Sequence, residues 1–198
     1  MSHAHALEHY TSTGLDNRKV AIWTFIGSEC LFFASLISTY LVYKGRDTTG
    51  PTPEHILEIP LVTVGTALLL FSSLFVVIAL NGAQHGNRRR LLTWLGMTIL
   101  CGLFFVGMQV YEFTHFVHEG LKMQTNLFGA SFYTLTGFHG THVSLGVLWL
   151  ITVFITAARG KLPPAKSLNL EMAALYWHFV DVVWIVIFPV VYLMKSST

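Results

Sequence analysis

An ionisable pair, His178 and Asp181, lies inside the last long apolar stretch of the chain, Met172–Met194. Trp177 and Trp184 stand beside this pair, and at 100° per residue all four side chains fall on one side of a helix. A charged group at the middle of a bilayer costs about 2.5–3.5 kcal/mol on insertion scales, so such residues normally face protein and find partners there. The pattern predicts a membrane helix that turns a polar side towards neighbouring helices.

Glu112 and His115 form an E-x-x-H pair, which in di-iron bundles supplies two metal ligands from one helix. Such a site needs a second E-x-x-H and two more glutamates from facing helices. No second E-x-x-H occurs, and the only other acids within apolar stretches are Glu29 and Asp181. We therefore predict no metal site in this chain.

Three histidines within the apolar stretches could in principle hold haem, because His139 and His142 share one helix and His178 lies on another. An autonomous haem-binding electron carrier is therefore one open alternative, and a small proton-coupled transporter is another. Histidines in such positions are more often paired with acids or hydroxyls than used as ligands. We expect Glu112 to pair with His139 or His142, and leucine at Asp181 to damage folding or association by stranding a donor. The predicted interhelical polar network comprises Glu112, His115, His139, His142, His178 and Asp181.

Glu29 lies about 15 Å of helical rise from the start of its apolar stretch, so an unpaired carboxyl there should be neutral. It has three possible roles: a structural hydrogen bond inside the bundle, proton handling, or contact with a bound lipid. Intramembrane acids often mark function.

The composition indicates an integral membrane protein. Of 198 residues, 53% are hydrophobic and 11% are charged, whereas soluble domains average about 25% charged residues. Five stretches approach the length of about 20 residues that a bilayer requires. We predict an all-α bundle of five transmembrane helices in one domain, residues 18–198, after a polar cytoplasmic tail, residues 1–17. The predicted spans are about Val20–Tyr43, Pro60–Asn81, Leu91–Phe113, Ser131–Ala158 and Met172–Met194.

The distribution of lysine and arginine predicts the orientation. Four basic residues flank the stretches on one side: Lys44, Arg46, Lys122 and Lys195. Eight flank them on the other side, which is therefore expected to be cytoplasmic: Arg18, Lys19, Arg88, Arg89, Arg90, Arg159, Lys161 and Lys166. The N-terminus should thus lie in the cytoplasm and the C-terminus outside. Cys30 and Cys101 are isolated and read as small buried hydrophobes. The second stretch carries no charge and should face lipid over much of its surface.

Three motifs, in the right order, resemble subunit III of cytochrome c oxidase, a haem–copper oxygen reductase. They are Gly27–Phe33 (GSECLFF), Thr136–Val143 (TGFHGTHV) and Tyr176–Trp184 (YWHFVDVVW). The resemblance extends over about Arg18–Met194. Long members of this family have seven helices around a lipid-filled cleft, and this chain resembles the short bacterial form with five.

The resemblance implies a supporting, non-catalytic subunit of a bacterial terminal oxidase that reduces oxygen to water and pumps protons. Such a subunit packs on subunit I, with subunit II and membrane phospholipids as further partners in a hetero-oligomer of the cell membrane. It holds no cofactor; haem and copper belong to subunits I and II. Glu29 matches the buried glutamate of the family, which is associated with lipid contact. No nucleic-acid partner is expected. Subunit III of a quinol oxidase and the homologous accessory protein of nitric oxide reductase remain alternatives.

Overall fold

The computed structural model describes residues 16–44, 59–124, 126–163 and 167–194. Within them lie five long helices, α2 (Asn17–Tyr43), α4 (Ile59–Gln84), α5 (Arg88–His118), α6 (Leu127–Ala158) and α7 (Leu168–Phe188). All five are long and apolar enough to cross a membrane, which confirms the predicted all-α membrane bundle. Most of the predicted polar tail, and the basic residues Arg46, Lys166 and Lys195, lie outside the described residues.

Polar residues define where the helices begin. Asp16, Asn87 and Asn126 stand immediately before α2, α5 and α6, and each side chain accepts a hydrogen bond from a backbone N–H of the first turn. These caps satisfy donors that a helix start leaves without partners. At the other end of α5 and α6, Gly120 and Gly160 adopt φ values of 86° and 71°. Such left-handed backbone suits glycine and ends a helix.

The last helix changes its winding at a proline. Pro189 follows α7 directly and begins a five-residue π-helix, η2 (Pro189–Leu193). Proline has no N–H to donate to the preceding turn, so the regular α-helical pattern cannot continue through it. The sequence predicts a local loosening of the helix at this position, and the structure contains one.

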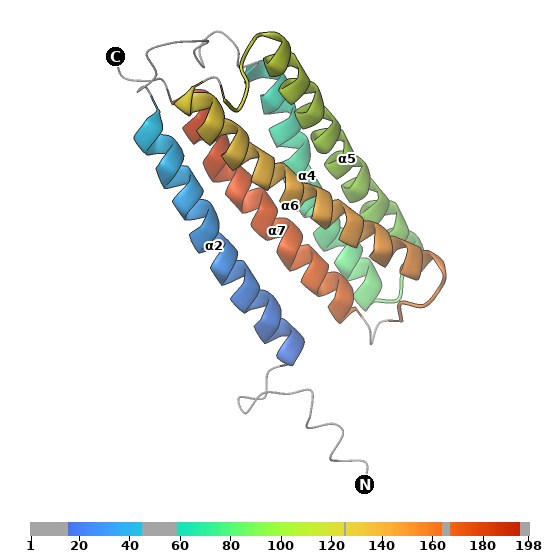
Figure 1. Cartoon of the computed structure of the whole chain (residues 1–198). Helices are drawn as coiled ribbons and strands as arrows, with labels where there is room; N and C mark the ends of the chain where they lie inside the picture. Colours follow the sequence, from blue (N-terminus) through green and yellow to red (C-terminus); the bar gives the residue numbers. More distant parts are fainter. Residues whose placement is uncertain (1–15, 45–58, 125, 164–166, 195–198) are drawn as a thin grey trace.

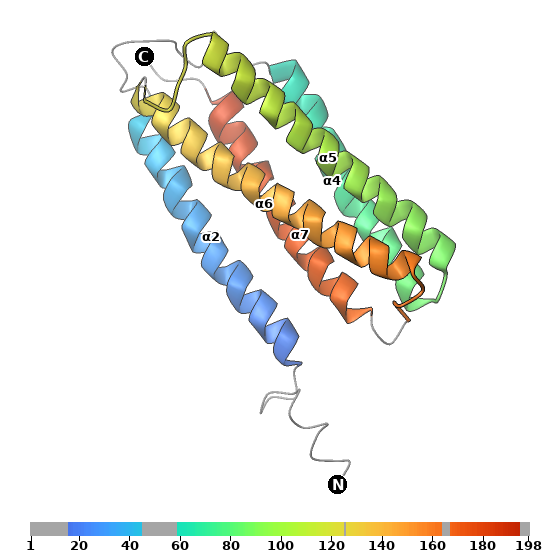
Figure 2. The same ribbon diagram turned by 45° about the vertical axis from the view of Figure 1, so that its right-hand side comes forward.

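Four of the helices form a closed arrangement, in which α4 packs on α5, α5 on α6, α6 on α7 and α7 on α4. The first helix, α2, lies outside this group and packs only along α6 and α7 among its principal contacts (Figures 1 and 2). Only 11% of the most apolar window of α2 is buried, compared with 56% for the last helix. Helix α2 is therefore the least buried of the five helices within this chain.

Lysines at both ends of α2 hold it to the last helix. Near its start, Lys19 Nζ lies 2.6 Å from Glu171 Oε1. At its end, Lys44 Nζ donates to the carbonyls of Val190 and Met194, at 2.8 and 2.5 Å. Burial lowers the pKa of Lys44.

The side of α7 that faces α4 is hydrogen-bonded to hydroxyl groups. The indole N–H of Trp177 donates to Ser72 Oγ and that of Trp184 donates to Thr66 Oγ1, both at 2.9 Å. Both indoles are almost completely buried. Although α4 carries no charge and has an exposed apolar surface, its hydroxyls therefore satisfy the tryptophans of α7.

Candidate functional site

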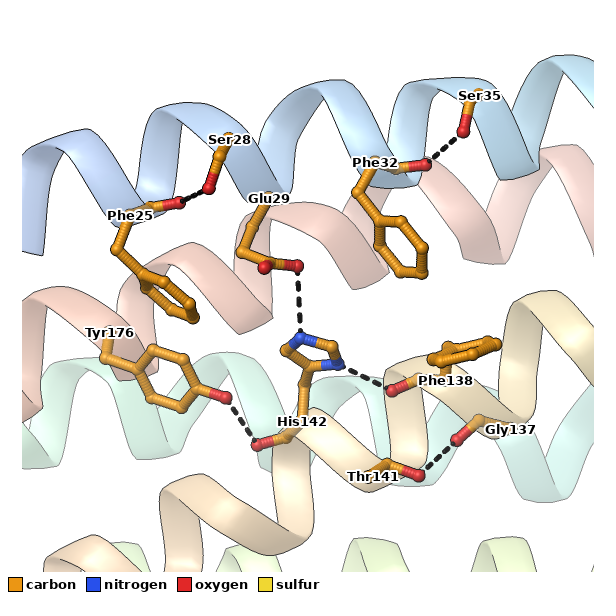
Figure 3. A network of polar contacts seen from close by, with 10 residues as sticks. All are labelled: Phe25, Ser28, Glu29, Phe32, Ser35, Gly137, Phe138, Thr141, His142 and Tyr176. Carbon is orange, nitrogen blue, oxygen red and sulfur yellow. Dashed lines mark hydrogen bonds and ion pairs between the residues drawn. The ribbon is translucent and has the colours of Figure 1, made fainter.

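Glu29 of α2 meets His142 of α6 on the inner side of α2 (Figure 3). Glu29 Oε2 lies 3.2 Å from His142 Nε2, and the side chains are 20% and 13% exposed. The rings of Phe25 and Phe32 flank the carboxyl group on its own helix. An acid and an imidazole therefore meet between two apolar helices, beside aromatic rings.

The second nitrogen of His142 determines the tautomer of its ring. Nδ1 lies 2.8 Å from the carbonyl oxygen of Phe138, and because a carbonyl can only accept, Nδ1 must carry a proton. Nε2 can then accept a proton from a neutral Glu29 or donate one to an ionised Glu29.

Aromatic side chains fix the imidazole in place. Phe33 meets the ring of His142 edge to face, with centroids 5.0 Å apart. The hydroxyl of Tyr176 donates to the backbone carbonyl of His142 at 3.1 Å, which ties α7 to the same turn of α6. The acid–imidazole pair thus lies where α2, α6 and α7 meet.

Glu112 and His115 lie elsewhere, near the end of α5. Both carboxyl oxygens of Glu112 are 3.0 Å from the hydroxyl of Tyr192, which belongs to η2. The ring of His115 stacks on Tyr111 of its own helix. The prediction that Glu112 pairs with His139 or His142 is therefore wrong, because a tyrosine beyond the proline supplies the donor.

His139 is fully buried among aromatic rings. Its imidazole stacks on Trp184, with centroids 4.8 Å apart and planes at 23°, and meets Phe105 edge to face at 5.9 Å. Neither ring nitrogen has a hydrogen-bond partner in the described part of the chain. His139 is thus held by packing against aromatic side chains. The polar contacts predicted for it are not found among the described residues.

His178 and Asp181 belong to the contact of α7 with α4. His178 Nδ1 is 2.5 Å from Ser73 Oγ. Asp181 is 2% exposed, and neither of its oxygens forms a hydrogen bond of good geometry with another described residue. The Ser73 hydroxyl also lies beside Asp181, so it can donate its one proton either to that carboxyl group or to His178 Nδ1. Ser73 is the candidate for the donor that leucine at Asp181 would strand, and the effect of that substitution stays a prediction.

Asparagine at Asp181 is expected to leave the stability of the bundle within about 1 kcal/mol of the wild type, since the shape is kept and the amide oxygen can still accept from the Ser73 hydroxyl. Ser73→Ala serves as the control at the same contact. It removes the partner of His178 and should cost about 1–2 kcal/mol. Thermal unfolding of both variants in detergent compares them, and a larger loss for Asp181→Asn than for Ser73→Ala would contradict this assignment.

The polar side chains predicted as one network thus form several separate contacts. No three His, Cys, Asp or Glu side chains come together as a metal site among the residues that the structure describes. Sequence reasoning missed Tyr192, Ser73 and Tyr176, which supply the hydroxyl partners. Their only sequence signal is a hydroxyl group within an apolar stretch, a signal that many residues of this chain share.

The whole chain matches the family described as cytochrome c oxidase subunit III, over residues 2–196. It is 43% identical over 178 residues to cytochrome c oxidase subunit 3 of Bacillus sp. (strain PS3), and the aligned residues cover 90% of this chain and 86% of that protein. It is 39% identical over 188 residues to quinol oxidase subunit 3 of Bacillus subtilis, covering 95% and 92%. It is 37% identical over 192 residues to cytochrome bo(3) ubiquinol oxidase subunit 3 of Pseudomonas aeruginosa, covering 97% and 91%.

Proposed function

This chain belongs to the cytochrome c oxidase subunit III family, and we propose that it supports its terminal oxidase complex without holding redox centres of its own. It is a multi-pass membrane protein of a bacterial oxidase with five apolar helices. The observation that carries the proposal is that its polar side chains join its own helices. Glu29 meets His142, Tyr192 donates to Glu112, and Ser73 bonds His178.

The proposed partners are subunit I as the main contact, subunit II and membrane phospholipids. Haem and copper would belong to the partner subunits, where oxygen is reduced. The N-terminus would lie in the cytoplasm and the C-terminus outside, as the excess of lysine and arginine at the Arg88–Arg90 end favours. In this arrangement, the Glu29–His142 pair would hold one proton within the membrane and help sustain proton uptake by the complex.

Purification through a tag on this chain, in a mild detergent, tests the assignment to an oxidase complex. We expect haem- and copper-bearing subunits in equal ratio with this chain. The isolated subunit should show no Soret band. A band stoichiometric with the separated chain would overturn the non-redox role and return His139, His142 and His178 to consideration as haem ligands.

We propose cytochrome c as the electron donor of the complex, in line with the 43% identity to the Bacillus sp. (strain PS3) protein. Quinol is the second candidate, because the quinol oxidase subunits match over a larger share of this chain, 95% and 97%. Oxygen consumption by the purified complex with reduced cytochrome c or with a quinol separates the two. Turnover with quinol alone would overturn the first choice.

Glutamine at Glu29 is expected to leave assembly intact, because its amide N–H can donate to His142 Nε2 as a neutral carboxyl does. The variant has no exchangeable proton at this position, so the rate of proton uptake, or the number of turnovers before inactivation, should fall. The ratio of co-purified subunits and the decay of activity during turnover are the two measurements. Failure of this variant to co-purify with the other subunits would contradict a neutral carboxyl group at Glu29.

A further inference from the structure

A shallow hollow of about 300 Å³ opens at the start of α5, at the turn that follows α4. Five residues line it: Asn87, Arg89, Arg90, Thr93 and Trp94. The neighbouring Arg88 donates a hydrogen bond from its guanidinium to the carbonyl of Ala158, so the start of α5 lies beside the end of α6. This end of the bundle carries most of the basic residues. Helix α5 lies on the opposite side of the four-helix group from α2, the helix that carries Glu29 (Figure 1).

Three polar side chains that line the hollow form no hydrogen bond with a described residue and can therefore contact a ligand. Arg89 and Arg90 are exposed, and neither guanidinium forms an ion pair or hydrogen bond with a described residue. By contrast, Lys19 is paired with Glu171 at the same end of the bundle. The Thr93 hydroxyl also makes no hydrogen bond to a described residue, whereas most hydroxyls of the spans bond a carbonyl of the preceding turn.

The backbone adds to this positive potential. Asn87 Oδ1 accepts the N–H of Arg90, while the N–H of Arg89 belongs to the same first turn and has no intrahelical acceptor. The aligned peptide dipoles of a helix of 31 residues favour negative charge near this turn. Two unpaired guanidinium groups, a hydroxyl and a helix start therefore converge on one hollow without an anionic group in its lining.

Below the hollow, towards the membrane interior, the same face of α5 is apolar and exposed. Met97, Leu100 and Phe104 follow Arg90 and Thr93 at helical spacing and are 42%, 62% and 50% exposed. Trp94 lies between the two zones, with its indole against Phe75 of α4 at 5.2 Å. Tryptophan is enriched at the level of lipid headgroups, where one part of the ring is apolar and the other is wet.

We propose that this hollow binds the phosphodiester headgroup of an anionic phospholipid, whose acyl chains lie along Met97, Leu100 and Phe104. Arg89, Arg90 and Thr93 would hold the phosphate oxygens, and Trp94 would contact the glycerol region. A basic pocket at a membrane surface is a recognised setting for such headgroups. The apolar strip directly beneath the cations distinguishes a lipid from a free phosphate, since an inorganic anion gains nothing from it. This site rests on the proposed function in one respect, since it assigns a place on α5 to one of the membrane phospholipids proposed there as partners.

The fluorescence of Trp94 provides a local test. The complex is purified through a tag on this chain and mixed with phosphatidylglycerol brominated near the carboxyl end of its acyl chains, or with phosphatidylcholine brominated in the same way. The difference in emission between the wild type and Trp94→Phe isolates the quenching of Trp94. We expect quenching by phosphatidylglycerol at a lower mole fraction, with a preference of about fivefold for each arginine that contacts the headgroup.

Three variants locate the site. Arg89→Gln/Arg90→Gln should remove the preference for phosphatidylglycerol, and Thr93→Leu should weaken it by filling the hollow while all charges remain. Arg18→Gln/Lys161→Gln removes two charges from the same end of the bundle, outside the hollow, and should leave the preference unchanged. An equal loss in this control would overturn the site, because a diffuse surface charge would then suffice.

Three further outcomes would also overturn the proposal. Full release of phosphatidylglycerol by millimolar inorganic phosphate, with no contribution from the acyl chains, would make the hollow a site for free anions. Loss of another subunit from the complex on Arg89→Gln/Arg90→Gln would make it a protein contact. Unchanged quenching in both the double variant and Thr93→Leu would rule out the hollow itself.

Discussion

Alanine at Trp177 is expected to destabilise the bundle by about 3–5 kcal/mol, the range that removal of a buried tryptophan costs. The indole is completely buried and donates its N–H to Ser72 of α4. It also lies against two glycines. A Cβ built on Gly146 of α6 would come within 2.9 Å of the ring, and one built on Gly102 of α5 within 2.7 Å. One side chain of α7 therefore fills the space between three other helices, and its loss leaves a cavity that all four share.

A pair of glycine variants on α5 tests this explanation without removing the tryptophan. Leucine at Gly102 should cost several kcal/mol, because Trp177 and Val147 occupy the space that the new side chain needs. Leucine at Gly107, five residues further along, meets no atom within 4 Å of its Cβ and should be tolerated. Thermal unfolding or titration with a denaturing detergent measures both. Equal losses would show that helix propensity or lipid contact, and not the indole, sets the cost.

Leucine at His142 is expected to lower the free energy of unfolding by about 1–3 kcal/mol, because it leaves the carboxyl of Glu29 without a partner in an apolar setting. The cost falls towards the lower end of that range because Glu29 remains 20% exposed. The second variant, Glu29→Leu/His142→Leu, removes both polar groups and should recover most of the stability. A double-mutant cycle in unfolding experiments measures the coupling. Additive losses would show that the two side chains do not depend on each other.

The same variants separate stability from function. His142→Leu/Glu29→Leu is expected to assemble with the oxidase complex yet lack the shared proton, so it should lose activity during turnover faster than the wild type. Normal assembly together with a wild-type rate of inactivation during turnover would mean that the pair contributes to packing alone. The pair is then a structural contact, and the proton-handling role proposed for Glu29 would be wrong.

The helices could be predicted from apolar length, but their ends could not. Helix α7 begins at Leu168, before the predicted Met172, and α5 continues to His118, beyond the predicted Phe113. Helix α6 begins at Leu127 because Asn126 caps it, four residues before the predicted start. Hydrophobicity marks only the part of a helix that crosses hydrocarbon, while caps and helix continuation in the polar zone set the real ends.

The residue types of the candidate site could be predicted, whereas their pairing could not. Glu29 and His142 were both identifiable as polar groups within apolar stretches, yet the sequence does not state the rotation of α2 against α6 that joins them. Glu112 shows the same limit, since its partner Tyr192 lies in a π-helix whose winding rotates that residue. Hydrogen-bond partners between helices depend on interhelical register, a property of the assembled bundle.

The lateral position of α2 has a consequence for how the protein is made. This helix is synthesised before α6 and α7, the helices on which it packs. During synthesis it therefore enters the bilayer before its packing partners exist. Ser28 and Ser35 can form their hydrogen bonds at that stage, because they donate to carbonyls of their own helix. The contact of Glu29 with His142 forms only after α6 is inserted. Integration of α2 thus precedes the docking that completes its acid–imidazole contact, and translation time separates the two events.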